Sequence, residues 1–510
     1  MPRLSRRSLV LGATALAACK RAALDAPLAK STPPSASSHA TIADWQALGR
    51  GLSGELIMPD HARFPSERLI HNARFDSARG PLAIVRCLDE REVQDVIAFA
   101  RRFAIPIAAR SGGHSYAGYS LSPGIVIDLA PMNRIAFADG NATVGAGALL
   151  VDVYDELARY GVSVPGGTCP SVGIAGLTLG GGMGVVGRKY GLTCDRLIAA
   201  RVVTADGRVI ACDDERDPDL YWALRGGGGG NFGVVTELSF RTYRLEALTT
   251  FRLTFRWADA ARVVAAWQVW GPHAPDEVWS ALGLSADGKS HELPEVELGG
   301  ALIGKDLDVI LRPLLEQIKR EPISETRKTF APREIVKGIA DCEGLTISQC
   351  HKPGRTPEAK LTRSAFVASS DIYGGPLSEG GIETMLRNVA ERQAAGQKGM
   401  VLLDALGGAI NHVKSHETAF VHRNDHFTAQ YLAGFPVGTE ESVLAEADDW
   451  IQRLKVAMRG WSTGRAYQNY IDARLDDWRA AYYGDNYPRL AKVRAAYDPT
   501  RMFRFPQGID

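Results

Sequence analysis

The chain has 510 residues, of which 45% are hydrophobic and 23% charged, and its formal net charge is +1. This composition is ordinary for a soluble globular protein, and the length allows two or three domains. Because the charge is near zero and no basic stripe is present, nucleic acid is not a favoured partner.

Residues 1–19 have the pattern of an export signal. A basic start with Arg6-Arg7 precedes an apolar run over 9–18 that is too short to span a bilayer as a mature helix. The paired arginines predict export through the twin-arginine route, to the periplasm or cell surface. An incidental basic and apolar start is the alternative. Residues 16–19 also resemble a bacterial lipobox, which would anchor the protein by a lipid on Cys19, whereas an ordinary cleavage site would not.

Residues 20–60 are expected to be a tether and N-terminal extension, with Ala, Ser and Pro prominent over 20–40. From there to residue 161, short strands alternate with helices. Asp89 is expected to cap a helix over 89–104 that has one apolar face. A second helix over 149–161 is expected to end on Gly161. Strands are predicted at 81–87, 105–110, 124–129 and 142–147.

The loop 110–120, with the sequence RSGGHSYAGYS, follows the strand 105–110 directly. Successive backbone N–H groups in such a glycine and serine turn form a nest suited to phosphate. His114 lies inside it and is nucleophilic when neutral. By residue type alone, a loop histidine is more often a hydrogen-bonding residue than a covalent anchor.

A glycine-rich segment follows at 166–192, and residues 182–187 formally match the pattern GxGxxG. A dinucleotide-binding turn needs a strand before this pattern and a helix after it. Neither flank has that character, so we do not interpret the match as a Rossmann fingerprint. Beyond it, a hairpin is predicted over 197–212 with its turn at Asp206-Gly207, and a strand over 231–243.

After residue 246 the pattern changes to that of a separate α+β domain. Strands are predicted at 249–257 and 427–435. Helices are predicted at 258–270, 307–319, 379–396 and 440–459. The last fifty residues are rich in tyrosine, which suits either a binding surface or the packing of one domain on another.

The chain has seven cysteines and no metal-ligand spacing, so no metal site is predicted. Export permits disulfides. Cys342 and Cys350 are candidates for one, and two buried free thiols are at least as good an interpretation.

Five stretches in this order resemble the berberine-bridge-enzyme-like flavoprotein oxidases, within the fold named after p-cresol methylhydroxylase and vanillyl-alcohol oxidase. The stretches are 110–120, 166–192, 223–238, the YQNY motif at 467–470, and 482–509. The resemblance covers about residue 60 to 510. It implies an α+β fold: a two-part FAD-binding domain of two α/β subdomains, and an inserted α+β substrate domain with an antiparallel sheet flanked by helices. The implied domains are FAD-binding 61–246, substrate 247–460, and a C-terminal segment 461–510 that completes the FAD domain and the active site.

The resemblance implies FAD as the cofactor, bound covalently through His114 to the flavin 8α carbon and through Cys169 to carbon 6. Covalent attachment keeps a cofactor that an exported protein could not replace, and it raises the redox potential of the flavin. The loop 110–115 would hold the pyrophosphate. The expected cofactor-binding residues are His114, Cys169, Arg110, Ser111, Gly112, Gly113, Ser115, Gly166, Thr168, Val172, Gly173, Gly176, Gly233, Val235, Tyr467 and Asn469.

The same resemblance implies Tyr470 as the base that takes a proton from a substrate hydroxyl. A free tyrosine has a pKa of about 10, so it needs a neighbouring charge or hydrogen bond. We expect Asp404 to be the supporting acid, and a buried capping aspartate is an equal alternative. Val172 favours oxygen as electron acceptor, and Leu177 stands where alkaloid-cyclising members have histidine, which argues against ring closure.

We therefore expect an exported FAD oxidase that acts on a hydroxyl-bearing small molecule, such as a sugar, an oligosaccharide or a secondary-metabolite alcohol, and that reduces O2 to H2O2. A dehydrogenase with another electron acceptor is the first alternative. A lipid-anchored surface protein that binds a ligand without turnover is the second. Tyr116 and Tyr119 lie either near the flavin or under the loop.

Overall fold

A small, largely parallel sheet carries the loop that contains His114. Its strand order is β1 (Glu55–Ile57), β2 (Ala83–Arg86), β4 (Ile125–Asp128) and β3 (Ile107–Arg110), with β1 antiparallel to β2. The computed structural model describes residues 39–510 apart from 79, 341 and 354, and the predicted export signal, lipobox and most of the tether lie outside these residues. All four residues of β4 are buried, as expected for a strand covered on both faces.

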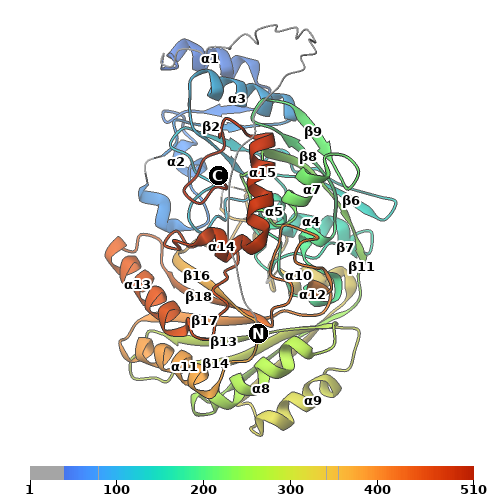
Figure 1. Ribbon diagram of the computed structural model, residues 1–510, viewed down its shortest axis with the longest axis vertical. Coiled ribbons are helices and arrows are strands. Elements are labelled where there is room, and N and C mark those ends of the chain that lie inside the picture. Colours follow the sequence, from blue (N-terminus) through green and yellow to red (C-terminus); the bar gives the residue numbers. More distant parts are fainter. Residues whose placement is uncertain (1–38, 79, 341, 354) are drawn as a thin grey trace, which may run out of the picture. The chain divides into compact units, whose positions relative to one another are not determined.

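The helix α3 (Glu90–Arg102) connects β2 to the parallel strand β3, a connection that parallel pairing requires (Figure 1). The side chain of Asp89 accepts a hydrogen bond from the N–H of Glu92 and so caps the helix. Its buried face includes Val93, Val96 and Ile97. The predicted cap and apolar face are confirmed.

A second sheet is antiparallel, with the order β5-β6-β10-β8-β9. Its strands are β5 (Ile135–Ala138), β6 (Asn141–Gly145), β8 (Leu197–Val203), β9 (Val209–Cys212) and β10 (Val234–Arg241). The hairpin β8–β9 turns at Gly207, whose φ of 87° requires glycine, and this confirms the predicted turn. A two-stranded ribbon of β7 (Val162–Ser163) and β11 (Tyr243–Arg244) lies apart from it.

The third sheet is antiparallel and has seven strands, in the order β15-β12-β14-β13-β17-β18-β16. Helices α8 (Ala260–His273), α11 (Glu379–Ala394) and α13 (Glu441–Met458) pack on one face of it (Figure 1). On β17 and β18 the side chains alternate: Val401, Leu403 and Tyr431 enter the core under these helices, and their neighbours face the opposite side. The strands are β12 (Leu248–Phe255), β13 (Val278–Asp287), β14 (Glu295–Ile303), β15 (Ser324–Phe330), β16 (Ala365–Tyr373), β17 (Lys398–Ala405) and β18 (Phe427–Phe435).

The predicted fold class is confirmed: mixed helices and sheets, with an antiparallel sheet flanked by helices in the second half of the chain. The four helices predicted there are α8 (Ala260–His273), α9 (Leu307–Ile318), α11 (Glu379–Ala394) and α13 (Glu441–Met458). The helix predicted at 149–161 is α4 (Leu150–Ala158), which ends three residues early because the chain turns before Gly161. Residues 39–510 form one compact unit, so the predicted domain boundaries within it stay predictions.

Several elements were not predicted from the sequence. The longest of them are four strands of the seven-stranded sheet: β13, β14, β16 and β17. The helices are α1 (Ile42–Gly51), α2 (Phe64–Glu67), α5 (Ile174–Leu179), α6 (Gly187–Tyr190), α7 (Pro218–Leu224), α10 (Ile335–Ile339), α12 (Ala409–His412), α14 (Trp478–Tyr483) and α15 (Tyr487–Tyr497). Residues 182–187 follow the helix α5 and end on Gly187, the first residue of the short α6. Because no strand precedes them, the GxGxxG match is no strand–turn–helix unit, as expected from its flanks.

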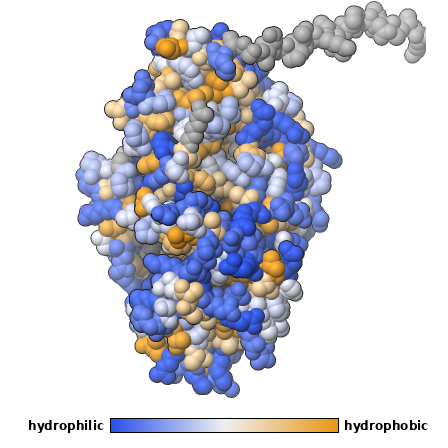
Figure 2. Space-filling model, turned by 90° about the vertical axis from the view of Figure 1, so that its left-hand side faces the viewer, coloured by the Kyte–Doolittle hydropathy of each residue, from blue (hydrophilic) through white to orange (hydrophobic). Residues whose placement is uncertain are grey.

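Cys342 and Cys350 form a disulfide, so the alternative of two free thiols is wrong. Cys87, Cys194 and Cys212 are buried free cysteines. Large apolar side chains are exposed singly rather than in one patch, and Figure 2 shows a mostly hydrophilic face with scattered apolar residues. Within 39–510, apart from the three gaps, no helix has the length and apolar character needed to cross a bilayer.

A buried ion pair fastens the segment 418–426 to the glycine-rich half of the chain. The guanidinium of Arg423 donates to both carboxylate oxygens of Asp195, at 2.9 and 2.6 Å, and the side chain of Arg423 has no exposed surface. Removing one partner of such a pair leaves a buried charge without compensation.

We expect Arg423→Met to lower the free energy of unfolding by about 3–5 kcal/mol, measured as a lower midpoint of urea unfolding. Arg216→Met is the matched control, because Arg216 pairs with Asp213 at the surface and its loss is expected to leave the midpoint unchanged. Equal midpoints for the two variants would contradict the assigned role of the buried pair.

Candidate active site

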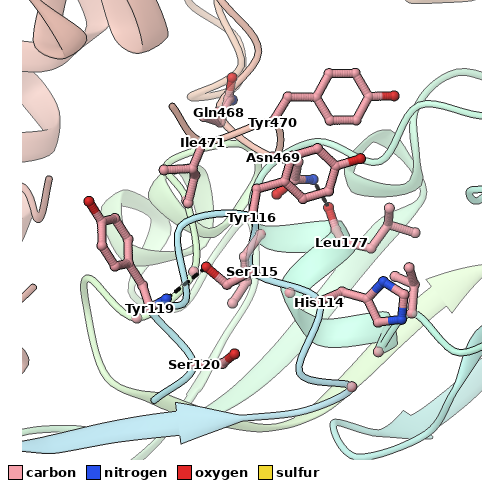
Figure 3. Close-up of a pocket in the computed structure, with 18 of the residues that line it drawn as sticks. His114, Ser115, Tyr116, Tyr119, Ser120, Leu177, Gln468, Asn469, Tyr470 and Ile471 are labelled. Atoms are coloured by element: carbon pink, nitrogen blue, oxygen red, sulfur yellow. Dashed lines mark hydrogen bonds between the residues drawn. The ribbon is translucent and has the colours of Figure 1, made fainter. Parts of the chain in front are cut away.

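A cavity of about 710 Å³ is lined by residues from all the predicted site segments. One part of its wall comes from the glycine-rich segments around 111–123, 167–184 and 228–235. The opposite part comes from the seven-stranded sheet, with Trp279, Asp404 and Gln430, and from the YQNY motif. Residues more than 350 positions apart in the sequence therefore meet in one space (Figure 3).

Close backbone contact fixes the loop 110–115. A Cβ on Gly112 would lie 2.2 Å from the backbone nitrogen of Gly173 and 2.8 Å from the carbonyl oxygen of Ser171, so only glycine fits there. Gly113 has a φ of 69°. The hydroxyl of Ser111 donates to the carbonyl of Ala146 at 2.5 Å. The loop is thereby locked against the segment that carries Cys169.

His114 and Cys169 both line the cavity, on two segments that lie against each other. The imidazole of His114 lies 2.9 Å through Nε2 from Oγ of Ser171 and stacks on the ring of His71, with centroids 3.9 Å apart. Burial, and then the charge of Lys352, hold the pKa of His114 well below its usual range. His114 is therefore neutral and nucleophilic at physiological pH.

Two predicted cofactor-binding residues do not line the cavity. The guanidinium of Arg110 is buried and bound to the carboxylate of Asp128, at 2.8 Å, and to the carbonyl of Glu67, at 2.7 Å. Gly166 packs against the hydroxyl of Tyr154. Their expected contact with the cofactor stays a prediction, and in the structure both hold the surrounding backbone. Fourteen other predicted residues do line it: Ser111, Gly112, Gly113, His114, Ser115, Thr168, Cys169, Val172, Gly173, Gly176, Gly233, Val235, Tyr467 and Asn469.

The glycine-rich wall fits a bound FAD. A Cβ on Gly176 would meet no atom within 4 Å, so open space adjoins its backbone where a flat ring could lie. Gly228 and Gly230 have φ values of 85° and 78°, which suits a nest of N–H groups for phosphate. Among the described residues that line the cavity, the ones of charged type are Arg504 and Asp404, and Asp404 lies on the sheet. The glycine-rich wall could therefore hold the dinucleotide through its backbone N–H groups.

Tyr467 and Asn469 fasten the YQNY motif to the glycine-rich segment. The hydroxyl of Tyr467 accepts hydrogen bonds from the N–H groups of Gly182, at 3.0 Å, and Met183, at 3.3 Å. Nδ2 of Asn469 donates to that hydroxyl at 2.9 Å and to the carbonyl of Leu177 at 3.0 Å. Because these polar atoms are used within the protein, the two residues position the wall as well as line it.

Four polar side chains gather at the sheet side of the cavity. The rings of Tyr116 and Tyr470 are stacked, with centroids 5.3 Å apart and planes within 18° (Figure 3). Nε2 of Gln430 donates to the hydroxyl of Tyr116 at 2.8 Å. Asp404 lies on β17, and Gln430 lies on the adjacent strand β18. The sequence singled out Tyr470 and Asp404 but left Tyr116 open and missed Gln430.

Burial raises the pKa of the Asp404 carboxyl to about 7. Burial raises the pKa of Tyr470 as well, and the nearby Tyr116 and Asp404 raise it further. Asp404 therefore cannot support Tyr470 by making its phenolate easier to form. A carboxyl with a pKa of about 7 is itself matched to accept a proton near neutral pH. Its place within β17 also excludes the alternative of a capping aspartate.

Comparisons with known proteins agree on one family. Residues 81–213 match the model described as "FAD binding domain", and residues 466–510 match the one described as "Berberine and berberine like". An uncharacterised FAD-linked oxidoreductase of Bacillus subtilis, YgaK, is 33% identical over 468 residues, 90% of this chain and 97% of that protein. The chitooligosaccharide oxidase of Gibberella zeae is 30% identical over 453 residues, 84% of this chain and 87% of that protein.

Solved structures give the same result. The BBE-like 1 protein of Physcomitrella patens superposes with a TM-score of 0.82 at 28% identity, covering 91% of this chain and 99% of that one. A chitooligosaccharide oxidase structure superposes with a TM-score of 0.81 at 26% identity and the same coverage.

We expect Gly112→Ala to abolish retention of flavin, because the new methyl group would push the loop 110–115 away from Gly173. The measurement is the flavin absorbance of the purified protein per chain. Gly460→Ala is the control, since a Cβ there meets no atom within 4 Å. A flavin content of Gly112→Ala equal to that of the control would show that the contact is dispensable.

Proposed function

The chain belongs to the berberine-bridge-enzyme-like family of FAD-linked oxidoreductases, and from this premise we propose that it oxidises a hydroxyl-bearing small molecule and passes the electrons to O2. The observation that carries the proposal is the meeting of Tyr116, Tyr470, Gln430 and Asp404 with His114 and Cys169 in one cavity. FAD bound there would supply the hydride acceptor and, once reduced, the electrons that convert O2 to H2O2. The side chains of the sheet supply what the flavin lacks, a base for the hydroxyl proton.

In this proposal Asp404 is the final proton acceptor. Its pKa of about 7 places the carboxylate close to the operating pH, where a general base is most effective. Tyr470 and Tyr116 orient the substrate hydroxyl, because their raised pKa values keep both phenols protonated and able to donate hydrogen bonds. Gln430 fixes Tyr116 through its amide N–H.

We also propose that FAD is attached at two points, to His114 and to Cys169. Support comes from the placement of both side chains on the cavity wall and from the neutral state of His114. Attachment at two points fixes the cofactor and raises its redox potential.

The residues that line the cavity also limit which electron acceptor and which class of substrate are plausible. Val172 lines the cavity, in keeping with the small side chain expected of an oxidase, and a dehydrogenase with another acceptor is the second candidate. No lysine lines the cavity within the described residues, and its one arginine is Arg504. A neutral alcohol or sugar suits this wall better than a phosphate or carboxylate, and chitooligosaccharides are candidates through the relatives named for them.

We propose export by the twin-arginine route, on the evidence of the pattern at 1–19, with lipid attachment at Cys19 as an addition. The disulfide between Cys342 and Cys350 supports an oxidising compartment. The twin-arginine route carries folded proteins, which suits loading of the flavin before export.

The two attachment points are separable by variants. We expect His114→Ala to keep flavin on Cys169, Cys169→Ala to keep it on His114, and the double variant to hold none after denaturation. Peptide mass spectrometry locates the flavin, and peroxide release in air with a panel of sugars and alcohols tests the oxidase. Flavin on neither peptide of the unaltered protein would refute double attachment. Reoxidation only by an artificial acceptor would favour the dehydrogenase.

The pH dependence of kcat/KM tests Asp404. Because only the ionised carboxylate accepts a proton, kcat/KM should rise as pH increases through about 7. Asp404→Asn should lose about 10²–10⁴-fold in kcat/KM and the rise with it. The matched control is Asp287→Asn, a change of a half-buried carboxylate at the end of β13 that does not line the cavity. A rise that persists in Asp404→Asn would assign the base to another group.

A further inference from the structure

Two neighbouring side chains fix the orientation of the His114 imidazole, one at a ring nitrogen and the other at the ring face. Its Nε2 lies 2.9 Å from the hydroxyl of Ser171, a buried residue with 4% of its surface exposed. Its face stacks on His71, with planes within 13°. His71 is itself fixed, since its backbone N–H donates to the carbonyl of Gly113 at 2.9 Å. The orientation of the ring is therefore set before any cofactor reaches it.

This arrangement decides which nitrogen of His114 is nucleophilic. A neutral imidazole carries its proton on one nitrogen and a lone pair on the other. With Nε2 engaged by Ser171, Nδ1 is the nitrogen left for a bond to carbon. The hydroxyl of Ser171 can accept a hydrogen bond from Nε2–H, and the tautomer with its proton on Nε2 leaves the lone pair on Nδ1.

The surroundings also keep both stacked rings uncharged. Burial, together with the charges of Lys352 and Arg363, lowers the pKa of His71 to about 3. Lys352 acts on His114 in the same direction. A protonated imidazole has no lone pair for bond formation, so the neutral state of His114 is what covalent attachment requires.

We propose that Ser171 and His71 are positioning residues for the formation of the bond between His114 and the flavin. The inference rests on the covalent attachment proposed above. Nδ1 forms a bond to the flavin methyl carbon, which loses one hydrogen as a proton, while the Nε2 proton leaves by way of Ser171. The two electrons of the broken C–H bond reduce the flavin, and O2 takes them with two protons to give H2O2.

The test is a time course of attachment. Full-length protein produced under riboflavin limitation is incubated with FAD in air, and the fraction of His114 peptide that carries flavin is followed by mass spectrometry. We expect Ser171→Ala to slow this bond by about fivefold to tenfold, and Ser171→Thr, which keeps a hydroxyl, to stay near the unaltered rate. Ser239→Ala, a serine on β10 away from the cavity lining, is the matched control.

A second pair of variants keeps the proposal open to refutation if Ser171→Ala folds poorly. His71→Phe retains a flat ring for stacking and should attach flavin at the unaltered rate, whereas His71→Leu should be slower. The flavin on Cys169 serves as an internal reference that neither pair should change. Unaltered rates in both Ser171→Ala and His71→Leu would overturn the proposal. Absence of flavin from His114 in the unaltered protein would instead refute the proposed attachment itself.

Discussion

The approach of two backbones, at Gly112 and Gly173, is the constraint on which the rest of the site depends. With side chains at these positions the loops could not meet, because a Cβ on Gly112 would lie 2.2 Å from the neighbouring nitrogen. Their contact brings His114 to Ser171 and sets Cys169 on the same cavity. The YQNY motif then closes the glycine-rich segment from the other side, through the hydroxyl of Tyr467.

The cavity has two regions in which burial shifts the pKa values of different ionisable groups. Around His114, burial and nearby cations keep histidines neutral, which favours bond formation at nitrogen. Around Asp404, burial without a compensating cation raises the carboxyl pKa to about 7, which favours proton exchange. The same physical cause, desolvation, thus prepares a nucleophile in one region and a base in the other.

Much of this could be predicted from the sequence, because the informative residues are local. The cap at Asp89, the turn at Gly207 and the strands beside the loop 110–115 each depend on neighbours a few positions away. The family resemblance, rather than residue type alone, predicted the roles of His114, Cys169 and Tyr470. Gln430 was missed because its hydrogen-bond partner, Tyr116, is distant in sequence. The strands β13 and β14 pair with each other locally, but their outer partners, β17 and β12, are distant in sequence. The pairing of Arg110 with Asp128 could not be predicted from the sequence, because Asp128 comes from the adjacent parallel strand.

The alternation on β17 and β18 has a consequence for how the protein could diversify. Cavity-facing positions there, such as Leu402, Gln430 and Leu432, make no contribution to the core under the helices. The loops that would anchor the cofactor come from other parts of the chain. Substrate choice could therefore drift by exchange of a few strand residues, while the redox machinery and the stability of the fold are inherited unchanged. The sheet is an evolvable surface, and a natural target for redesign.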